Sequence, residues 1–173
     1  MPYNTISNKE EHAMVSIDLL EQSEIFKGLD NNQLGEIQKY CDIKEFRQGD
    51  KIFSEGEDAT HLCIVSEGQV ELRFDLPGHP TSDKNIISSV HQGKAFQWTT
   101  FVAPHKTRLS SYCASRTCKI IMINRNSLKG LCEKDTKAGY LMMLNLAGVV
   151  GKRFYKLQDE IVNRRGYETM FNW

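Results

Sequence analysis

The chain has 173 residues with 22 basic and 22 acidic side chains, so its formal net charge at neutral pH is zero. This length is enough for one domain with a hydrophobic core and some helical extension. The balanced charge gives no sign of an electrostatic DNA-binding surface, although a local basic patch is compatible with a neutral total.

Neither a membrane anchor nor an export signal is predicted. The sequence lacks an apolar run of the ~18 residues that a membrane-spanning helix needs. The first residues, MPYNTISNKEEHAM, have no basic region followed by an apolar one, so we expect no signal peptide. We therefore expect a cytoplasmic protein without a membrane partner.

Five cysteines occur, an odd number, and they form no C-x-x-C pair. This pattern disfavours a zinc site, and in a cytoplasmic protein it predicts reduced thiols. The five residues are Cys41, Cys63, Cys113, Cys118 and Cys132.

Two short helices are predicted near the N-terminus. Residues 1–12 are polar, and we expect them to be flexible. Met14, Ile17 and Leu20 then repeat at three-residue spacing, which predicts a helix. A second helix follows a glycine break, with Asp30 as its candidate N-cap.

From Asp42 the pattern changes to short strand-like runs separated by turn signals. The runs HLCIV and QVELRF flank a glycine-containing turn and predict a β-hairpin. Similar runs continue to about residue 124. Several short strands at close spacing predict a barrel or jelly roll, and they disfavour a parallel sheet.

The helical pattern returns after the strands, and we expect C-terminal helices over about residues 126–162 and a tail at 163–173. A stripe of apolar residues in the last helix alternates four- and three-residue spacing, as in a coiled-coil seam. The same stripe suits a helix that packs against its own barrel, so both an intramolecular and a dimer seam remain open. Its members are Met143, Ala147, Val150, Phe154, Leu157 and Ile161.

The order of these elements resembles that of a cyclic-nucleotide-binding domain. The matching features are an apolar-Phe-x-Gly-Leu opening, a strand that ends in Gln48-Gly49-Asp50, the turn IFSEGED and the run IVSEGQVEL. The resemblance covers about residues 18–155. It implies a mainly β fold, a double-stranded β-helix (a jelly roll or β-roll), with N-terminal helices and a long C-terminal helix. We assign the domain to residues 13–162 and its β-roll to about 42–124.

In that family a Phe-Gly-Glu sequence begins the cassette that binds the cyclic phosphate, and its carboxylate accepts from the ribose 2′-hydroxyl. Phe96 keeps the first position, Gln97 replaces the glycine and Trp98 replaces the acid. The stretch FQWTTFVAP also resembles a bacterial stand-alone subset that reads Phe-Gly-Trp-Ser-x-Leu-Val and lacks the acid. The resemblance therefore implies a ligand such as cyclic AMP, cyclic GMP or another small anion, with affinity for the ordinary cyclic nucleotides altered or lost.

A Pro-Arg-x-Ala-Ser/Thr sequence follows in the family and supplies an arginine to the phosphate. Anchoring the comparison on Ala114 places Arg108 at the arginine, whereas anchoring on Pro104 favours Lys106. Both assignments remain open. The resemblance thus places the candidate ligand site at Phe96, Gln97, Trp98, Thr99, Lys106, Arg108, Ser110 and Ser111.

An enzyme is not expected. A β-roll also suits a cupin-like metal enzyme, but no His-x-His pair occurs, and no nucleophile elbow, P-loop or His-Glu-x-x-His motif is present. The histidines are His12, His61, His79, His91 and His105. Besides a ligand sensor, the alternatives are a degenerate protein-interaction scaffold that binds no nucleotide and, third, the cupin-like enzyme.

The segment after the stripe, QDEIVNRRGYETMFNW, is too short for a DNA-reading module. We therefore expect a regulatory domain in signal transduction without an attached DNA-binding or kinase effector. Its partners would be a small-molecule ligand and a second copy bound through the C-terminal helix, or an effector protein. Ligand binding would shift the turn at residues 96–103 and move the C-terminal helices between two states.

Overall fold

The structure is a computed structural model that describes residues 15–79 and 81–171. The segment 1–12, predicted to be flexible, lies outside these residues. The helices are α1 (Ile17–Glu21), α2 (Asn31–Gln38), α3 (Arg125–Lys134) and α4 (Thr136–Phe171), with two 3-10 turns, η1 (Asp83–Asn85) and η2 (Trp98–Phe101). The strands are β1 (Cys41–Arg47), β2 (Lys51–Phe53), β3 (His61–Glu67), β4 (Gln69–Arg73), β5 (Ile86–His91), β6 (Ala95–Phe96), β7 (Ser110–Cys113) and β8 (Thr117–Asn124).

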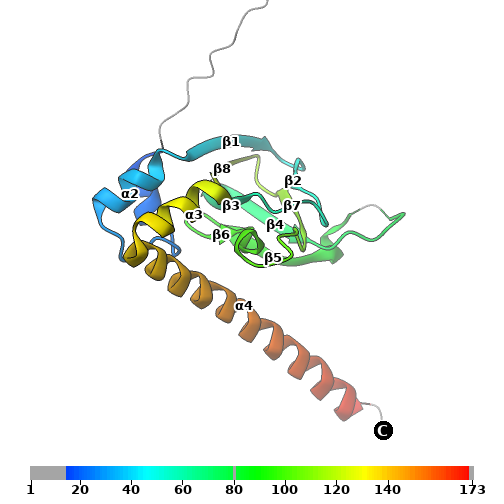
Figure 1. Ribbon diagram of the computed structural model, residues 1–173. Coiled ribbons are helices and arrows are strands. Elements are labelled where there is room, and N and C mark those ends of the chain that lie inside the picture. Colours follow the sequence, from blue (N-terminus) through cyan, green and yellow to red (C-terminus); the bar gives the residue numbers. More distant parts are fainter. Residues whose placement is uncertain (1–14, 80, 172–173) are drawn as a thin grey trace, which may run out of the picture.

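The strands form two four-stranded sheets, in the orders β1-β8-β3-β6 and β2-β7-β4-β5, and the neighbouring strands pair antiparallel. Figure 1 shows this roll with the short helices at one end and α4 running past it. The mainly β fold with N-terminal helices and a long C-terminal helix is therefore confirmed.

Strand β3 is apolar on both faces because the first sheet lies between two parts of the core. Leu62 and Ile64 are buried in a cluster with residues of the helices, whereas Cys63 and Val65 are buried in a cluster between the sheets. Alternate residues of a strand point to opposite faces. The uninterrupted run HLCIV therefore marks a strand that is covered on both sides.

Local chemistry sets the start of α2 as predicted. The Asp30 side chain accepts from the backbone N–H of Gln33, and the Gln33 side chain accepts from the backbone N–H of Asp30. This capping box pairs two backbone donors that would otherwise have no partner. The same glutamine donates to the Asp135 carboxylate at 2.7 Å, which connects α2 to the start of α4.

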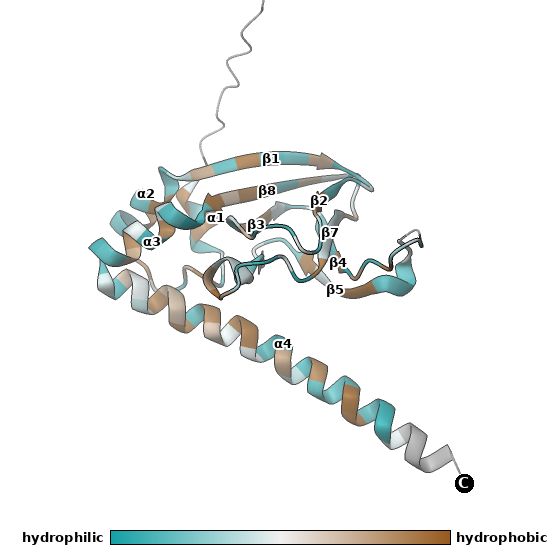
Figure 2. Ribbon diagram, turned by 45° about the vertical axis from the view of Figure 1, so that its right-hand side comes forward, coloured by the Kyte–Doolittle hydropathy of each residue, from teal (hydrophilic) through white to brown (hydrophobic). Residues whose placement is uncertain are grey.

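Helix α4 is anchored in its first half and projects in its second. Ala138, Met142, Leu146 and Val149 are buried on its inner face. The helix then continues to Phe171, nine residues beyond the predicted end at 162, so most of the predicted tail 163–173 is helical. Figure 2 shows hydrophobic residues at intervals along the projecting part. In the described part of the chain, no helix combines the length and apolarity required to cross a membrane.

One prediction about the cysteines is wrong. Cys113 and Cys118 form a disulfide with their Cα atoms 5.8 Å apart, whereas we expected five reduced thiols. Strand β7 ends at Cys113, and a short turn returns the chain into β8. This turn brings the two residues together although their spacing matches no cysteine motif.

Candidate ligand-binding site

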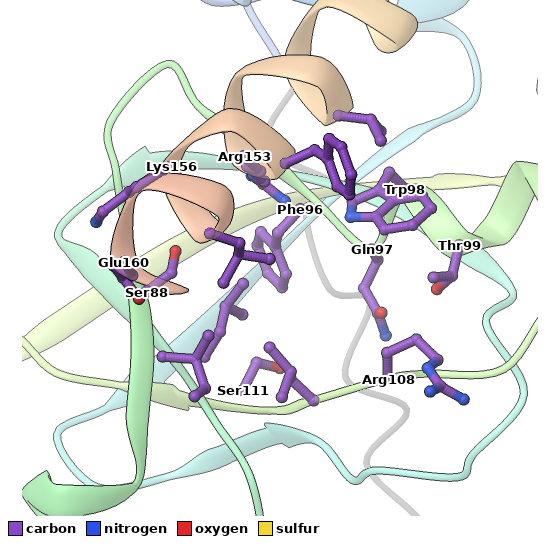
Figure 3. Close-up of a pocket in the computed structure, with 16 residues that line it drawn as sticks. Ser88, Phe96, Gln97, Trp98, Thr99, Arg108, Ser111, Arg153, Lys156 and Glu160 are labelled. Carbon is purple, nitrogen blue, oxygen red and sulfur yellow. The ribbon is translucent and has the colours of Figure 1, made fainter. Parts of the chain in front are cut away.

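A cavity of about 290 Å³ lies between the β-roll and helix α4 (Figure 3). Its size is near the lower end of the range for small-molecule pockets. The roll and the cassette contribute Leu72, Ile87, Ser88, Phe96, Gln97, Trp98, Thr99, Arg108, Leu109 and Ser111. Helix α4 contributes Val150, Arg153, Phe154, Lys156, Leu157 and Glu160.

Phe96 anchors the cassette at the end of β6. It is buried, and its ring meets that of Phe53 edge to face with the ring centroids 6.5 Å apart. Gln97 follows in the left-handed region, with φ 60° and ψ 33°, immediately before η2. A glycine adopts this conformation without steric cost, whereas a residue with a Cβ is disfavoured by roughly 1–2 kcal/mol. The turn therefore keeps a backbone geometry that suits the family glycine.

The Gln97 side chain compensates in part for this backbone conformation. Its Nε2 donates to Thr107 Oγ1 at 2.9 Å, which ties the start of η2 to the segment before β7. Trp98 comes next and is half-buried. It packs against the core cluster and also lines the cavity, where the family places its acid.

Arg108 and Lys106 occupy different environments. Lys106 forms an ion pair with Asp58, with Nζ 2.7 Å from Oδ1, and it does not line the cavity. Arg108 lines the cavity, is exposed and has no ion pair within the described residues. Figure 3 shows its guanidinium group turned away from the cavity centre. The geometry thus favours Arg108 over Lys106 as the cation available to a ligand.

The two serines of β7 are also separated. Ser111 lines the cavity, and its buried Oγ has no hydrogen-bond partner among the described residues. Ser110 lies outside the cavity, where its Oγ donates to Asp75 and accepts from the backbone N–H of Glu55 at 2.9 Å. Thr99 resembles Ser111, because it lines the cavity and its buried hydroxyl has no partner within the described residues.

Six of the eight predicted site residues therefore surround one cavity, and Lys106 and Ser110 lie outside it. Most of the cavity-lining residues that the family resemblance did not predict come from α4. Val150, Phe154 and Leu157 belong to the apolar stripe noted in the sequence, and they face the cavity. The stripe was the available signal, but its spacing does not tell which surface it covers.

Arg153 connects α4 to the cassette. Its Nη2 donates to the carbonyl of Ala95, the residue before Phe96. Burial lowers the pKa of the Arg153 guanidinium, and the charge of Glu24 opposes that shift. The ordinary pKa of arginine is so high that the group stays charged. Movement of α4 would therefore change a contact at the cassette itself.

A metal site receives no support from the described residues, because they contain no group of three or more His, Cys, Asp or Glu side chains that could hold an ion.

A family model for the cyclic nucleotide-binding domain matches residues 43–135. The chain belongs to this family. No curated protein matched this cyclic nucleotide-binding domain in a sequence comparison. Solved structures do resemble it. One is a candidate cyclic nucleotide-binding protein from Geobacter metallireducens GS-15, with 26% identity, coverage of 82% of this chain and 99% of that chain, and a TM-score of 0.69.

Two further structures share the fold of this cyclic nucleotide-binding domain. The catabolite activator protein of Thermus thermophilus has 20% identity and a TM-score of 0.66, with 80% of this chain and 62% of that chain covered. The regulatory domain of Toxoplasma gondii PKA, crystallised with cAMP, has 20% identity and a TM-score of 0.58, with 66% of this chain and 42% of that chain covered.

Proposed function

We propose that this chain is a regulatory, non-enzymatic ligand-sensing domain whose affinity for cyclic AMP and cyclic GMP is reduced or lost. The supporting observation is Trp98, which lines the cavity at the position of the ribose-binding acid. Glu160 is the one carboxylate among the described residues that line the cavity. Figure 3 shows it on α4, at the opposite end from Trp98.

The loss of the acid has a predictable cost for a cyclic nucleotide. A hydrogen bond to a charged group contributes roughly 1.5–3 kcal/mol, which corresponds to about tenfold to a hundredfold in affinity. Trp98 also offers one N–H donor and no acceptor to a ribose hydroxyl. The cavity nevertheless persists beside the tryptophan, and this favours a ligand sensor over a scaffold whose pocket is filled.

Calorimetry with cyclic AMP and cyclic GMP tests this proposal. The wild type should bind both more weakly than micromolar. The double variant Gln97→Gly, Trp98→Glu should bind cyclic AMP at least about tenfold more tightly, because it regains an acceptor for the ribose and a glycine at the left-handed position. Adding Arg108→Ala to the double variant should remove the gain. Micromolar or tighter binding by the wild type would contradict the proposal.

The signal would pass through α4. A ligand in the cavity would contact both the cassette and this helix, so its affinity would differ between positions of α4 and would bias them. Exposed apolar residues on α4, among them Tyr140, Leu144, Tyr155 and Val162, support a homodimer formed through this helix. An effector protein on the same face is the other candidate partner. We propose a cytoplasmic location without direct contact with DNA or membrane, in keeping with the balanced charge.

A further inference from the structure

We propose that the cavity takes an organic anion with an apolar body, such as a medium-chain carboxylate, in place of a cyclic nucleotide. This inference rests on the sensing function proposed above and names the chemical class of its ligand. Three independent features of the cavity support it: the apolar character of its walls, the Arg108 guanidinium, and two buried hydroxyl groups, the last two without partners among the described residues.

The apolar walls are incompletely covered. Ile87, Leu157 and Phe154 retain 40%, 45% and 58% of their surface exposed although all three line the same cavity. Leu72 and Leu109 line it from the sheet side. An apolar ligand body placed between the sheet and α4 would remove this surface from water, and apolar burial is the main source of binding free energy in such pockets.

The charges are unequally distributed along the cavity. Figure 3 places Arg108 with Gln97 and Thr99 at one end, and Lys156 with Glu160 on α4 at the other. Glu160, the one acidic side chain of the lining, lies at the end of Lys156, and Arg153 donates to the Ala95 carbonyl. Arg108 has neither an ion pair nor a hydrogen bond within the described residues. An exposed side chain changes rotamer within nanoseconds, so Arg108 can turn to a bound anion. The anionic group is therefore assigned to the Arg108 end.

Two hydroxyl groups in the cavity wall lack partners. Thr99 Oγ1 and Ser111 Oγ are buried and make no hydrogen bond within the described part of the chain. Buried polar groups in proteins nearly always have a partner. Both hydroxyls can donate to a carboxylate oxygen, which accepts several hydrogen bonds. A carboxylate at the Arg108 end would thus offer Thr99, which Figure 3 places at that end, an acceptor that the described residues do not supply.

The test is calorimetry of the full chain with butanoate, hexanoate and octanoate, with cyclic AMP for comparison. The affinity should rise about fourfold for each added methylene, the fold-change that corresponds to ~0.8 kcal/mol per buried CH₂. Octanoate should bind more tightly than cyclic AMP. An affinity that does not change with chain length would overturn the proposal that the ligand has an apolar body buried in the cavity.

Two matched variants locate the anion. Arg108→Ala should weaken octanoate binding by about tenfold to a hundredfold and leave the binding of neutral octan-1-ol unchanged. Lys106→Ala removes the same charge two residues away, outside the cavity, and should leave octanoate affinity within about twofold. Equal losses in the two variants, or no loss in Arg108→Ala, would overturn the placement of the anion at Arg108.

The outcomes separate this inference from the function on which it rests. Cyclic AMP binding weaker than micromolar, without measurable octanoate binding, would overturn the ligand class and leave the proposed ligand sensor in place. If neither probe binds a chain whose circular dichroism shows it to be folded, the ligand class fails, whereas the proposed loss of cyclic-nucleotide affinity stands. Micromolar binding of cyclic AMP is the outcome that contradicts the proposed function.

Discussion

Ser110 and Ser111 are neighbours in the sequence, and strand β7 turns their side chains to opposite faces of its sheet. Ser111 faces the cavity. On the other face the hydroxyl of Ser110 donates a hydrogen bond to the carboxylate of Asp75. The same carboxylate also accepts from Lys51 Nζ at 3.1 Å and from the Tyr112 hydroxyl at 3.2 Å. The hydrogen bond from Ser110, followed by the contacts with Lys51 and Tyr112, lowers the pKa of Asp75. Ser110, which is fully buried, thus makes its hydrogen bonds on the face of the strand that points away from the cavity.

We expect Asp75→Asn to lower the free energy of unfolding by roughly 1 kcal/mol at pH 7, because the amide cannot replace the charge that these donors stabilise. The folded-state pKa of Asp75 is depressed, so its contribution is present above the unfolded value of about 3.9 and is lost as the pH falls through the folded value. Urea unfolding of both proteins should therefore give a difference that narrows below about pH 4.

The matched control is Asp83→Asn, because the Asp83 side chain is 94% exposed and lies 3.6 Å from Arg73. Asp83→Asn should leave the free energy of unfolding nearly unchanged at every pH. A difference between wild type and Asp75→Asn that stays constant down to pH 2–3, roughly below the unfolded pKa, would contradict the assignment.

Helix α4 shows how the position of a residue on a helix decides its role. The side chains that anchor the helix are one residue out of step with the stripe seen in the sequence: Met142 is buried, whereas Met143 of the stripe is partly exposed. Successive residues are about 100° apart around a helix. The stripe therefore lies beside the anchoring face, and its middle part covers the cavity.

This packing of α4 predicts that substitutions of two adjacent methionines change the free energy of unfolding by different amounts. Met142 is 1% exposed and Met143 is 38% exposed. Met142→Ala should lower the free energy of unfolding by about 2–5 kcal/mol because it leaves a void in the core. Met143→Ala should change it by less than about 0.5 kcal/mol. Urea denaturation at one fixed protein concentration measures the free energy of unfolding of each variant. Similar losses in the two variants would contradict the packing in which Met142 faces the core and Met143 does not.

For the molecule as a whole, α4 combines two roles on different sides. One side closes the cavity, and another carries exposed apolar residues, including Leu144 and Val162. Both sides belong to one rigid helix, so a ligand that repositions α4 would also reposition the surface available to a second copy. The proposed dimer and the proposed sensing are thereby connected through a single element.

The double variant Leu144→Asp, Val162→Asp should convert a wild-type dimer into a monomer in light scattering, because charges would then be buried in the interface. Arg164→Asp provides the control: it also introduces an aspartate on α4, at an exposed position on the opposite side of the helix from Val162. It should leave the mass unchanged. A wild type that is already monomeric at concentrations of about 100 µM, where an interface with a Kd in the micromolar range forms, would overturn the dimer.

The sequence by itself determined the features that depend on neighbouring residues. Short strand-like runs between turn signals marked the strands, Asp30 marked the start of α2, and the FQW motif located the cassette. Each of these signals lies within a few residues, because hydrogen bonding, capping and side-chain alternation are short-range effects. The family resemblance then supplied the order of the elements and so the fold.

Only the tertiary structure decided between alternatives whose partners are distant in the chain. Lys106 is engaged because Asp58 lies opposite it, and Arg108 has no such partner within the described residues. The stripe of α4 covers the cavity because α3 and the start of α4 direct the helix across the roll. The disulfide between Cys113 and Cys118 is a different case: the two residues are only five apart in the chain, and the turn between β7 and β8 joins them although no cysteine motif marked the pair. Charge pairing and burial depend on separation in space, and local sequence patterns do not encode that separation.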